Sequence, residues 1–306
     1  MRALITGGAG FIGSHLTDHL IAERGADVVV LDNLKRGRLE NLTACRDRVQ
    51  FVEGDIRGDA LVTRLVKGID VVYHLAAQST VMGAEQEPEY ALTTNVLGTF
   101  NILRAAQAAG VKRVVVASSR EVYGEPDTVP VAEGAPLKAA NVYGLSKVAA
   151  EMCCRLFQAR GLSVAILRLA NVYGPRDMGR VIPSFIQRAL AGQPLLLYGG
   201  DQLVDFVWIA TVVDSLIRAA RIENPDGPVN VGSGAGTRLV DLARRIAAET
   251  EADGEIQVLP PRPVEVRRFV ADTRRMIRVL GVRPDSDPLA HLGELLHGRG
   301  HGHAEG

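Results

Sequence analysis

Residues 3–13 read Ala-Leu-Ile-Thr-Gly-Gly-Ala-Gly-Phe-Ile-Gly, a short apolar stretch that runs directly into a glycine-rich turn. A periodic segment comes next over 14–22, and a second apolar stretch, 28–31, ends at Asp32. Strand, glycine turn, helix, second strand and acid occur in this order in dinucleotide-binding units. The sequence therefore predicts that a dinucleotide binds where the helix begins, because its free N–H groups and its dipole attract phosphates.

Three glycines of the turn have separate predicted tasks. Gly7 or Gly8 permits the tight turn, and Gly10 lets the backbone approach the pyrophosphate. Gly13 allows the helix to pack closely on the sheet. The turn is therefore predicted to hold the central part of the dinucleotide.

Asp32 predicts which form of the cofactor binds. A carboxylate at the end of the second strand accepts hydrogen bonds from the adenosine ribose hydroxyls and repels a 2′-phosphate. Arg36 and Arg38 lie just beyond it and are interpreted as a solvated basic loop. The expected cofactor is NAD rather than NADP.

The composition is that of an ordinary globular protein. Of the 306 residues, 47% are hydrophobic and 23% are charged, and 35 basic residues balance 35 acidic ones. A net charge of zero argues against a broad nucleic-acid or membrane surface. No apolar run reaches the roughly 18 residues that a membrane span needs. Because the first predicted strand begins at residue 2, we expect no signal peptide in this sequence. Three cysteines, an odd number, fit reduced thiols and a cytoplasmic location.

Apolar runs alternate with helical patterns through the first half of the chain. This alternation predicts an α/β fold, a doubly wound parallel (Rossmann) sheet with helices on both faces. The ligand is then expected beyond the carboxyl ends of the strands. The predicted strands are 2–6, 27–31, 49–52, 69–74, 112–117 and 163–169, and the predicted helices include 13–23, 92–109 and 143–160.

The second half is predicted to form a smaller α/β substrate lobe. We expect an NAD-binding domain over 1–170 and a substrate-binding lobe over 171–306, with 204–222 packing back on the first domain. Within this lobe, the patterns predict helices at 181–191, 211–222 and 237–250, and a strand at 204–208. Residues 298–306 are interpreted as a flexible tail, and no metal site is expected.

Tyr143 and Lys147 stand four residues apart at the start of an apolar-periodic helix, which places both on one face. A tyrosine that exchanges a proton with a sugar hydroxyl must ionise below its usual pKa of about 10. A neighbouring ammonium group favours the phenolate. The pair is therefore predicted to be catalytic, with Lys147 also reaching the nicotinamide ribose.

With these motifs, the chain resembles the extended short-chain dehydrogenase/reductases, and among them the NAD-dependent nucleotide-sugar epimerase/dehydratase family. The resemblance covers about residues 1–285. It rests on the segments 6–13, 32–34, 54–56, 74–77, 118–124 and 168–175, together with Asn95, Tyr143 and Lys147.

The resemblance implies a role for each matching residue. Ser119 would bond the reacting sugar oxygen, Tyr143 would be the general base and acid, and Lys147 its electrostatic partner. Glu121 is added as a candidate catalytic residue. The implied cofactor contacts are Gly7, Gly10, Phe11, Ile12, Gly13, Asp32, Asn33, Asp55, Ile56, Leu75, Ala76, Ala77, Tyr143 and Lys147. The implied or candidate substrate contacts are Gln78, Ser119, Glu121, Asn171, Arg176 and Arg262.

The family's shared step is oxidation of the sugar at C4, and Glu121 bears on the fate of the resulting ketone. A glutamate before Val122-Tyr123-Gly124 is typical of dehydratases and UDP-glucuronate decarboxylases, whereas many 4-epimerases have a small or neutral residue there. Dehydratases that remove water across C5 and C6 usually add an aspartate where this chain has Arg120. We favour 4-epimerisation of a UDP-sugar. Dehydration with Glu121 as the C5 base and UDP-glucuronate decarboxylation remain alternatives, as does a simple pairing of Glu121 with Arg120.

Two positions of the second lobe depart from the family pattern. Val204 stands where an arginine usually contacts the nucleotide diphosphate, and Thr211 replaces a usual aspartate. Loss of a guanidinium removes a bidentate phosphate contact, so another base is expected to compensate. Arg262, Arg176 and Arg180 are the candidates, with Arg267.

The alternative from another class is a non-catalytic NAD-binding regulator. Such proteins keep the glycine turn but tend to lose the tyrosine and lysine, which this chain retains. A net oxidoreductase that consumes external NAD(P)H is disfavoured by Asp32. The resemblance also implies a homodimer in which helices such as 92–109 and 143–160 pair across a two-fold axis.

Overall fold

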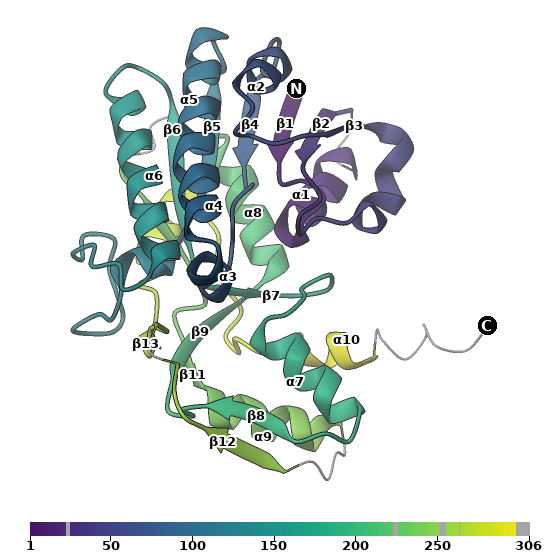
Figure 1. Cartoon of the computed structure of the whole chain (residues 1–306), viewed down its shortest axis with the longest axis vertical. Coiled ribbons are helices and arrows are strands. Elements are labelled where there is room, and N and C mark those ends of the chain that lie inside the picture. Colours follow the sequence, from purple (N-terminus) through teal and green to yellow (C-terminus); the bar gives the residue numbers. More distant parts are fainter. Residues whose placement is uncertain (23–24, 223–225, 251–254, 263, 298–306) are drawn as a thin grey trace.

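Seven parallel strands form the central sheet, in the order β10-β6-β5-β4-β1-β2-β3 (Figure 1). The computed structural model describes residues 1–306 apart from 23–24, 223–225, 251–254, 263 and 298–306, so the predicted flexible tail lies outside the described residues. The doubly wound parallel sheet predicted from the sequence is confirmed. Its strands are β1 Arg2–Thr6, β2 Asp27–Asp32, β3 Val49–Glu53, β4 Val71–His74, β5 Arg113–Ser119, β6 Val164–Leu169 and β10 Val229–Val231.

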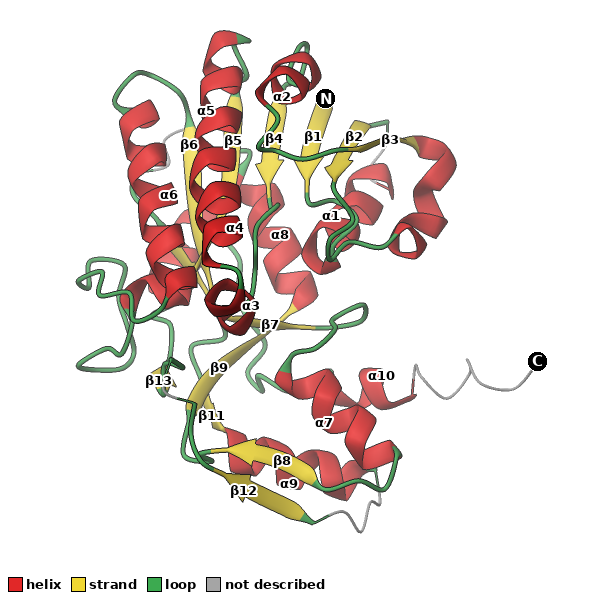
Figure 2. Cartoon of the chain, in the orientation of Figure 1, coloured by secondary structure: helices red, strands yellow, loops and turns green. Residues whose placement is uncertain are grey.

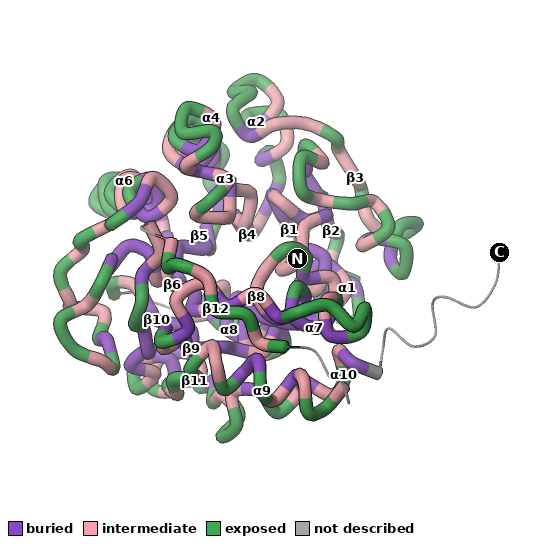
Figure 3. The backbone as a smooth tube through the Cα atoms, turned by 60° about the horizontal axis from the view of Figure 1, so that its bottom comes forward, coloured by how far each residue is buried: buried purple, intermediate pink, exposed green. Residues whose placement is uncertain are grey.

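Helices cover both faces of this sheet because successive strand residues point to opposite sides. Ala3 and Ile5 of β1 pack with the face covered by α1 (Phe11–Ala22) and α8 (Ile209–Ala219). Leu4 packs on the other face, which is covered by α2 (Asp59–Leu65), α5 (Thr99–Ala108) and α6 (Val142–Gln158). The buried segments in Figure 3 run along these strands and the inner sides of the helices.

The helix expected over 92–109 is present, but it begins earlier and contains a wide turn. Helix α4 (Pro88–Leu92) continues through a π-helical turn over Thr93–Gly98 into α5, and the short helix α3 (Val81–Gln86) comes before it. Within this turn, the Asn95 side chain accepts a hydrogen bond from Gln78 N and donates to Gln78 O and to Ser146 Oγ. The turn therefore ties the loop after β4 to α6.

The second lobe lies below the sheet in Figure 2 and has its own small core. Around β9 (Leu203–Trp208) pair β7 (Asn171–Tyr173), β11 (Gly236–Arg238) and β13 (Arg268–Phe269), and β8 (Leu195–Tyr198) pairs with β12 (Ile256–Leu259). Helices α7 (Val181–Leu190), α9 (Leu239–Glu249) and α10 (Leu292–His297) complete the lobe. The remaining short helical turns are 39–48, 120–123 and 276–280.

The chain crosses between the two lobes more than once. Strand β10, from beyond residue 170, is an edge strand of the first sheet, and α8 packs against α1. Strand β9 belongs to the second lobe although the helix that comes after it belongs to the first. These crossings hold the two lobes against each other around the carboxyl ends of the central strands.

Candidate active site

The glycine turn after β1 is shaped by close contacts that only glycine permits. Gly7 has a φ of +72°, and a Cβ there would lie 2.7 Å from the backbone N of Ala76. A Cβ on Gly13 would collide with the carbonyl oxygen of Gly7. At Gly10 the only atom that a Cβ would approach is Gly7 O, at 3.1 Å, and Gly10 lines a cavity. The turn thus leaves its backbone open toward that cavity.

The cavity that Gly10 lines has a volume of about 150 Å³ and lies beyond the carboxyl ends of β1, β2 and β4. We call it the cofactor cavity. The predicted cofactor residues that line it are Gly7, Gly10, Phe11, Ile12, Gly13, Asp32, Asn33, Ile56, Leu75, Ala76 and Ala77.

Asp32 ends β2 with its carboxylate held by the turn. Its Oδ2 accepts a hydrogen bond from Ala9 N at 3.0 Å and its Oδ1 from Leu34 N at 2.9 Å. Burial raises the pKa of this carboxyl, and the backbone hydrogen bonds oppose the rise. The carboxylate lines the cofactor cavity in a fixed orientation.

The cavity's polar groups fit a dinucleotide. Thr94 Oγ1 and Gln78 Oε1 are buried and have no hydrogen-bond partner among the described residues, yet both residues line this cavity. Unsatisfied buried polar atoms are costly unless a ligand or water completes them. Together with the Gly10 backbone and Asp32, they offer separate contacts to a pyrophosphate and a ribose.

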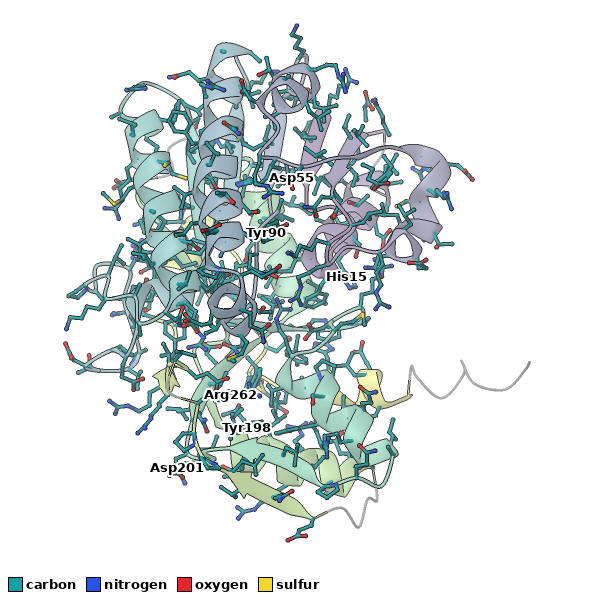
Figure 4. The ribbon with its side chains drawn as sticks, in the orientation of Figure 1. His15, Asp55, Tyr90, Tyr198, Asp201 and Arg262 are labelled. Atoms are coloured by element: carbon teal, nitrogen blue, oxygen red, sulfur yellow. The ribbon has the colours of Figure 1, made fainter. Side chains whose placement is uncertain are left out.

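Asp55 is the one predicted cofactor residue that lines neither cavity. Its carboxylate is occupied by Arg57 at 2.8 Å and by Asn33 Nδ2 at 2.9 Å. Asn33 also donates to Tyr90 Oη at 3.0 Å, and Lys35 Nζ lies 3.5 Å from the Tyr90 ring centre. In Figure 4, Asp55 and Tyr90 lie close together on the same side of the upper lobe. Asp55 therefore braces the cavity wall from outside.

A larger cavity, of about 640 Å³, opens between the two lobes. We call it the substrate cavity. Leu75, Ala77 and Ala117 line both cavities, so the two adjoin. The predicted residues that line the substrate cavity are Ser119, Glu121, Tyr143, Lys147, Asn171 and Arg262.

Local capping positions Tyr143 and Lys147 on α6. The Asn141 side chain caps this helix by accepting a hydrogen bond from Gly144 N at 2.8 Å. Lys147 is buried, and its Nζ donates to Ala117 O at 2.9 Å and lies 5.8 Å from the centre of the Tyr143 ring. Burial lowers the pKa of Lys147 to about 8, so its ammonium form persists below that pH.

The electrostatics of Tyr143 differ from the prediction that Lys147 is its electrostatic partner. Burial raises the pKa of the phenol above its usual value, while Ser119 and the nearby Arg180 guanidinium oppose the rise. Lys147 instead directs its ammonium to a carbonyl of β5. Ser119 and Arg180 are therefore the neighbours that favour the phenolate.

Glu121 is held on both of its oxygens. Arg120 Nη2 lies 2.8 Å from Oε1, and Asn141 Nδ2 donates to Oε2 at 2.8 Å. Arg120 Nε also donates to Asn171 Oδ1 at 2.7 Å. The structure therefore shows the pairing of Glu121 with Arg120, which the sequence left open as one alternative.

Two predicted substrate residues are placed elsewhere. Arg176 lines the cofactor cavity, because its guanidinium forms an ion pair with the carboxylate of Asp18 on α1, at 2.7 Å. Gln78 lines the same cavity, because Asn95 holds its backbone on that side. Neither lines the substrate cavity. The prediction that they contact the substrate is not supported by these positions.

Val204 is buried and lines the substrate cavity, so no cation stands there. Arg262 stands nearby, with its guanidinium 3.9 Å from the Tyr198 ring centre and 3.0 Å from Glu265. Figure 4 shows Arg262 and Tyr198 together in the lower lobe, away from Tyr90 and His15. Arg36 and Arg180 line both cavities. The interpretation of Arg36 as merely solvated is therefore incomplete.

Sequence reasoning gave Arg120 no site role and missed Tyr198 and Gln202, although all three line the substrate cavity. The sequence does show a cation, Arg120, directly after Ser119, and this unusual residue could have indicated a role in the site. Among the described residues, no cluster of histidine, cysteine, aspartate and glutamate is arranged to hold a metal ion. The described helices include none with the length and apolarity to cross a bilayer.

Comparison with known proteins agrees with this geometry. Residues 3–232 match the model of the NAD dependent epimerase/dehydratase family. The UDP-glucose 4-epimerase of Mycolicibacterium smegmatis is 38% identical over 295 residues, covering 93% of this chain and 94% of that protein.

Two of the solved structures that share the fold illustrate the range of reactions in their names. The UDP-glucose 4-epimerase of Thermotoga maritima, solved with UDP-glucose, has a TM-score of 0.92 and 33% identity, covering 97% of this chain and 98% of that one. The dTDP-glucose 4,6-dehydratase DesIV of Streptomyces venezuelae, solved with NAD, has a TM-score of 0.93 and 32% identity, covering 97% and 96%. The chain belongs to the NAD-dependent epimerase/dehydratase family.

Proposed function

We propose that this protein epimerises C4 of a UDP-linked sugar through a transient 4-keto sugar, with NAD held in the cofactor cavity. The observation that carries the proposal is that Ser119, Tyr143 and Lys147 line one cavity, with Lys147 bonded to Ala117, which lines both cavities. The named activities of the Mycolicibacterium and Thermotoga proteins support the choice of UDP-glucose 4-epimerase chemistry.

The chain's own residues move one proton. Tyr143 accepts the proton of the C4 hydroxyl, and Ser119 orients that oxygen by a hydrogen bond. NAD held by the residues of the cofactor cavity would supply the redox chemistry, as acceptor and then donor of the C4 hydride. Tyr143 then gives its proton back to the C4 oxygen after the ketone has turned its other face. No net oxidation occurs, and the product is the C4 epimer.

Arg180 assists Tyr143 electrostatically, because its guanidinium opposes the rise in the pKa of the phenol. Lys147 is held by Ala117 O at 5.8 Å from the centre of the Tyr143 ring, and we assign it to the nicotinamide ribose. A positioned acid–base group such as Tyr143 contributes about 10²- to 10⁴-fold to rate. We assign the second lobe, with Arg262 and Tyr198, to the nucleotide end of the substrate.

The environment of Glu121 favours epimerisation over elimination. Each carboxylate oxygen of Glu121 already has a donor partner, Arg120 or Asn141, which lowers its basicity toward a C5 proton. Loss of water across C5 and C6 also needs an acid for the leaving hydroxyl, and the adjacent side chain is the cation Arg120. Dehydration and decarboxylation are the alternatives that a panel of substrates distinguishes.

A substrate panel tests the proposal. The protein is purified, a denatured sample is analysed for released nucleotide, and the native protein is incubated with UDP-glucose, UDP-N-acetylglucosamine and UDP-glucuronate. We expect NAD in the denatured sample and a product isomeric with its substrate by mass spectrometry and NMR. A product lighter by water or by carbon dioxide would replace epimerisation with an alternative, and absence of NAD would refute the proposal.

We also propose that the protein is a cytoplasmic homodimer. Leu145, Met152 and Leu156, seven and four residues apart on α6, are 54%, 64% and 44% exposed, and Leu97 near the start of α5 is 48% exposed. Such a row of large apolar side chains on neighbouring helices fits a helix-to-helix contact between two copies. Sedimentation should give twice the 32.8 kDa of one chain, and a monomer at micromolar concentration would contradict it.

A further inference from the structure

We propose that Arg120 selects sugars that carry a carboxylate on C5, the carbon next to the reacting C4. The preferred substrate class is then a UDP-hexuronate rather than a UDP-hexose. This inference rests on the proposed function. It concerns which sugar occupies the substrate cavity, and it depends on the position, hydrogen bonds and remaining donor of the Arg120 guanidinium.

Arg120 stands at the reacting end of the substrate cavity. It comes directly after Ser119 at the end of β5 and lines the same cavity as Tyr143 and Lys147. Arg262, at the other end of the cavity, is in the second lobe. A sugar whose C4 oxygen contacts Ser119 therefore places the substituents of its neighbouring carbons within reach of Arg120.

The guanidinium of Arg120 has a fixed orientation. Its Nε donates to Asn171 Oδ1, its Nη2 forms an ion pair with Glu121 Oε1, and the side chain is only 14% exposed. The guanidinium also lies 5.9 Å from the Phe269 ring centre. Its orientation is set before substrate arrives, so little side-chain entropy is lost when it makes another bond.

One terminal nitrogen of this guanidinium remains available as a donor. Among the described residues, Nη1 of Arg120 has no hydrogen-bond partner, and this nitrogen is not among the atoms sealed from solvent. A guanidinium can bridge two carboxylates because its edges are separate donors. Nη2 binds Glu121, and Nη1 is left for an acceptor in the cavity.

The charges around Arg120 favour an anionic acceptor. Glu121 faces the same region, but Arg120 and Asn141 take up both of its oxygens, which limits its repulsion of a second anion. Arg180 and Arg262 in the same cavity are already paired with Asp177 and Glu265. A neutral CH₂OH group would accept only an ordinary hydrogen bond, whereas a carboxylate would form a charge-assisted one.

Equilibrium binding separates this specificity from turnover. In a Tyr143→Phe background, binding of UDP-glucuronate and UDP-glucose is measured by calorimetry with and without Arg120→Gln. We expect UDP-glucuronate to bind at least about 10-fold more tightly than UDP-glucose. Arg120→Gln should weaken UDP-glucuronate about 10- to 100-fold and UDP-glucose less than about 3-fold, and Arg120→Lys should recover part of the loss.

Arg244→Gln is the matched control, because this arginine is exposed on α9 and, among the described residues, pairs only with Asp241. It should leave both affinities unchanged. Equal losses for both ligands in Arg120→Gln, or tighter binding of UDP-glucose by the Tyr143→Phe protein, would overturn the inference.

Turnover by the wild type distinguishes this inference from the proposed function. Epimerisation of UDP-glucose with no preference for UDP-glucuronate refutes only the inference. Arg120-dependent loss of carbon dioxide from UDP-glucuronate supports the inference and refutes 4-epimerisation.

Discussion

Replacing Tyr143 with phenylalanine should lower kcat for the epimerisation by about three orders of magnitude, within the range of general acid–base contributions. The variant keeps the ring that lines the cavity and loses only the phenolic hydroxyl to which we assign the proton transfer. The measurement is the initial rate of epimer formation under saturating UDP-sugar. NAD released on denaturation and the melting temperature are the controls, and both should match those of the wild type.

Retained activity in Tyr143→Phe would assign the proton transfer to another group. A variant without bound NAD would show instead that Tyr143 acts in cofactor retention. Only a loss of kcat with unchanged NAD content supports the proton transfer that we assign to this residue.

The second large effect is expected on stability, at the buried ion pair that joins β6 to α6. Arg168 Nε and Nη2 bind Glu151 Oε1 and Oε2 at 2.9 and 2.7 Å, and neither side chain is more than 2% exposed. Ser118 Oγ donates to Oε1 of the same carboxylate. Glu151→Gln leaves a buried guanidinium without its counter-charge and should lower the free energy of unfolding by about 3–5 kcal/mol, measured by urea denaturation.

An exposed pair provides the matched control. Asp214 and Arg218 on α8 are 46% and 52% exposed and stand 3.1 Å apart. Asp214→Asn should change the free energy of unfolding by less than about 1 kcal/mol. Equal effects of the two substitutions would show that Arg168–Glu151 is not the link that we describe between the strand and the helix carrying Tyr143.

The first sheet was predictable because its elements carry strong local signals. The segments 2–6 and 27–31 have apolar centres and end abruptly. A glycine turn lies between them and Asp32 comes after the second, which identifies the strand–turn–helix–strand order. Tyr143 and Lys147 could be paired from helical spacing alone. Their cavity, however, needed the tertiary fold, because Ser119 comes from a different element.

The second lobe was less predictable because its strands are short. β7, β11 and β13 have two or three residues each, too few for a period of two to appear, and their pairing partner β9 is distant in sequence. The positions of charged side chains depend on ion pairing that sequence does not reveal. Arg176 pairs with Asp18, and Arg120 binds Glu121 and Asn171.

In the reaction that we propose, the C4 hydrogen leaves and returns to the same carbon while Tyr143 handles the proton. A UDP-sugar with deuterium at C4 is converted in ordinary water, and the product is analysed by NMR and mass spectrometry. We predict an epimer that retains deuterium at C4. An epimer with protium at C4, or a dehydrated product with deuterium moved to C6, would contradict this mechanism.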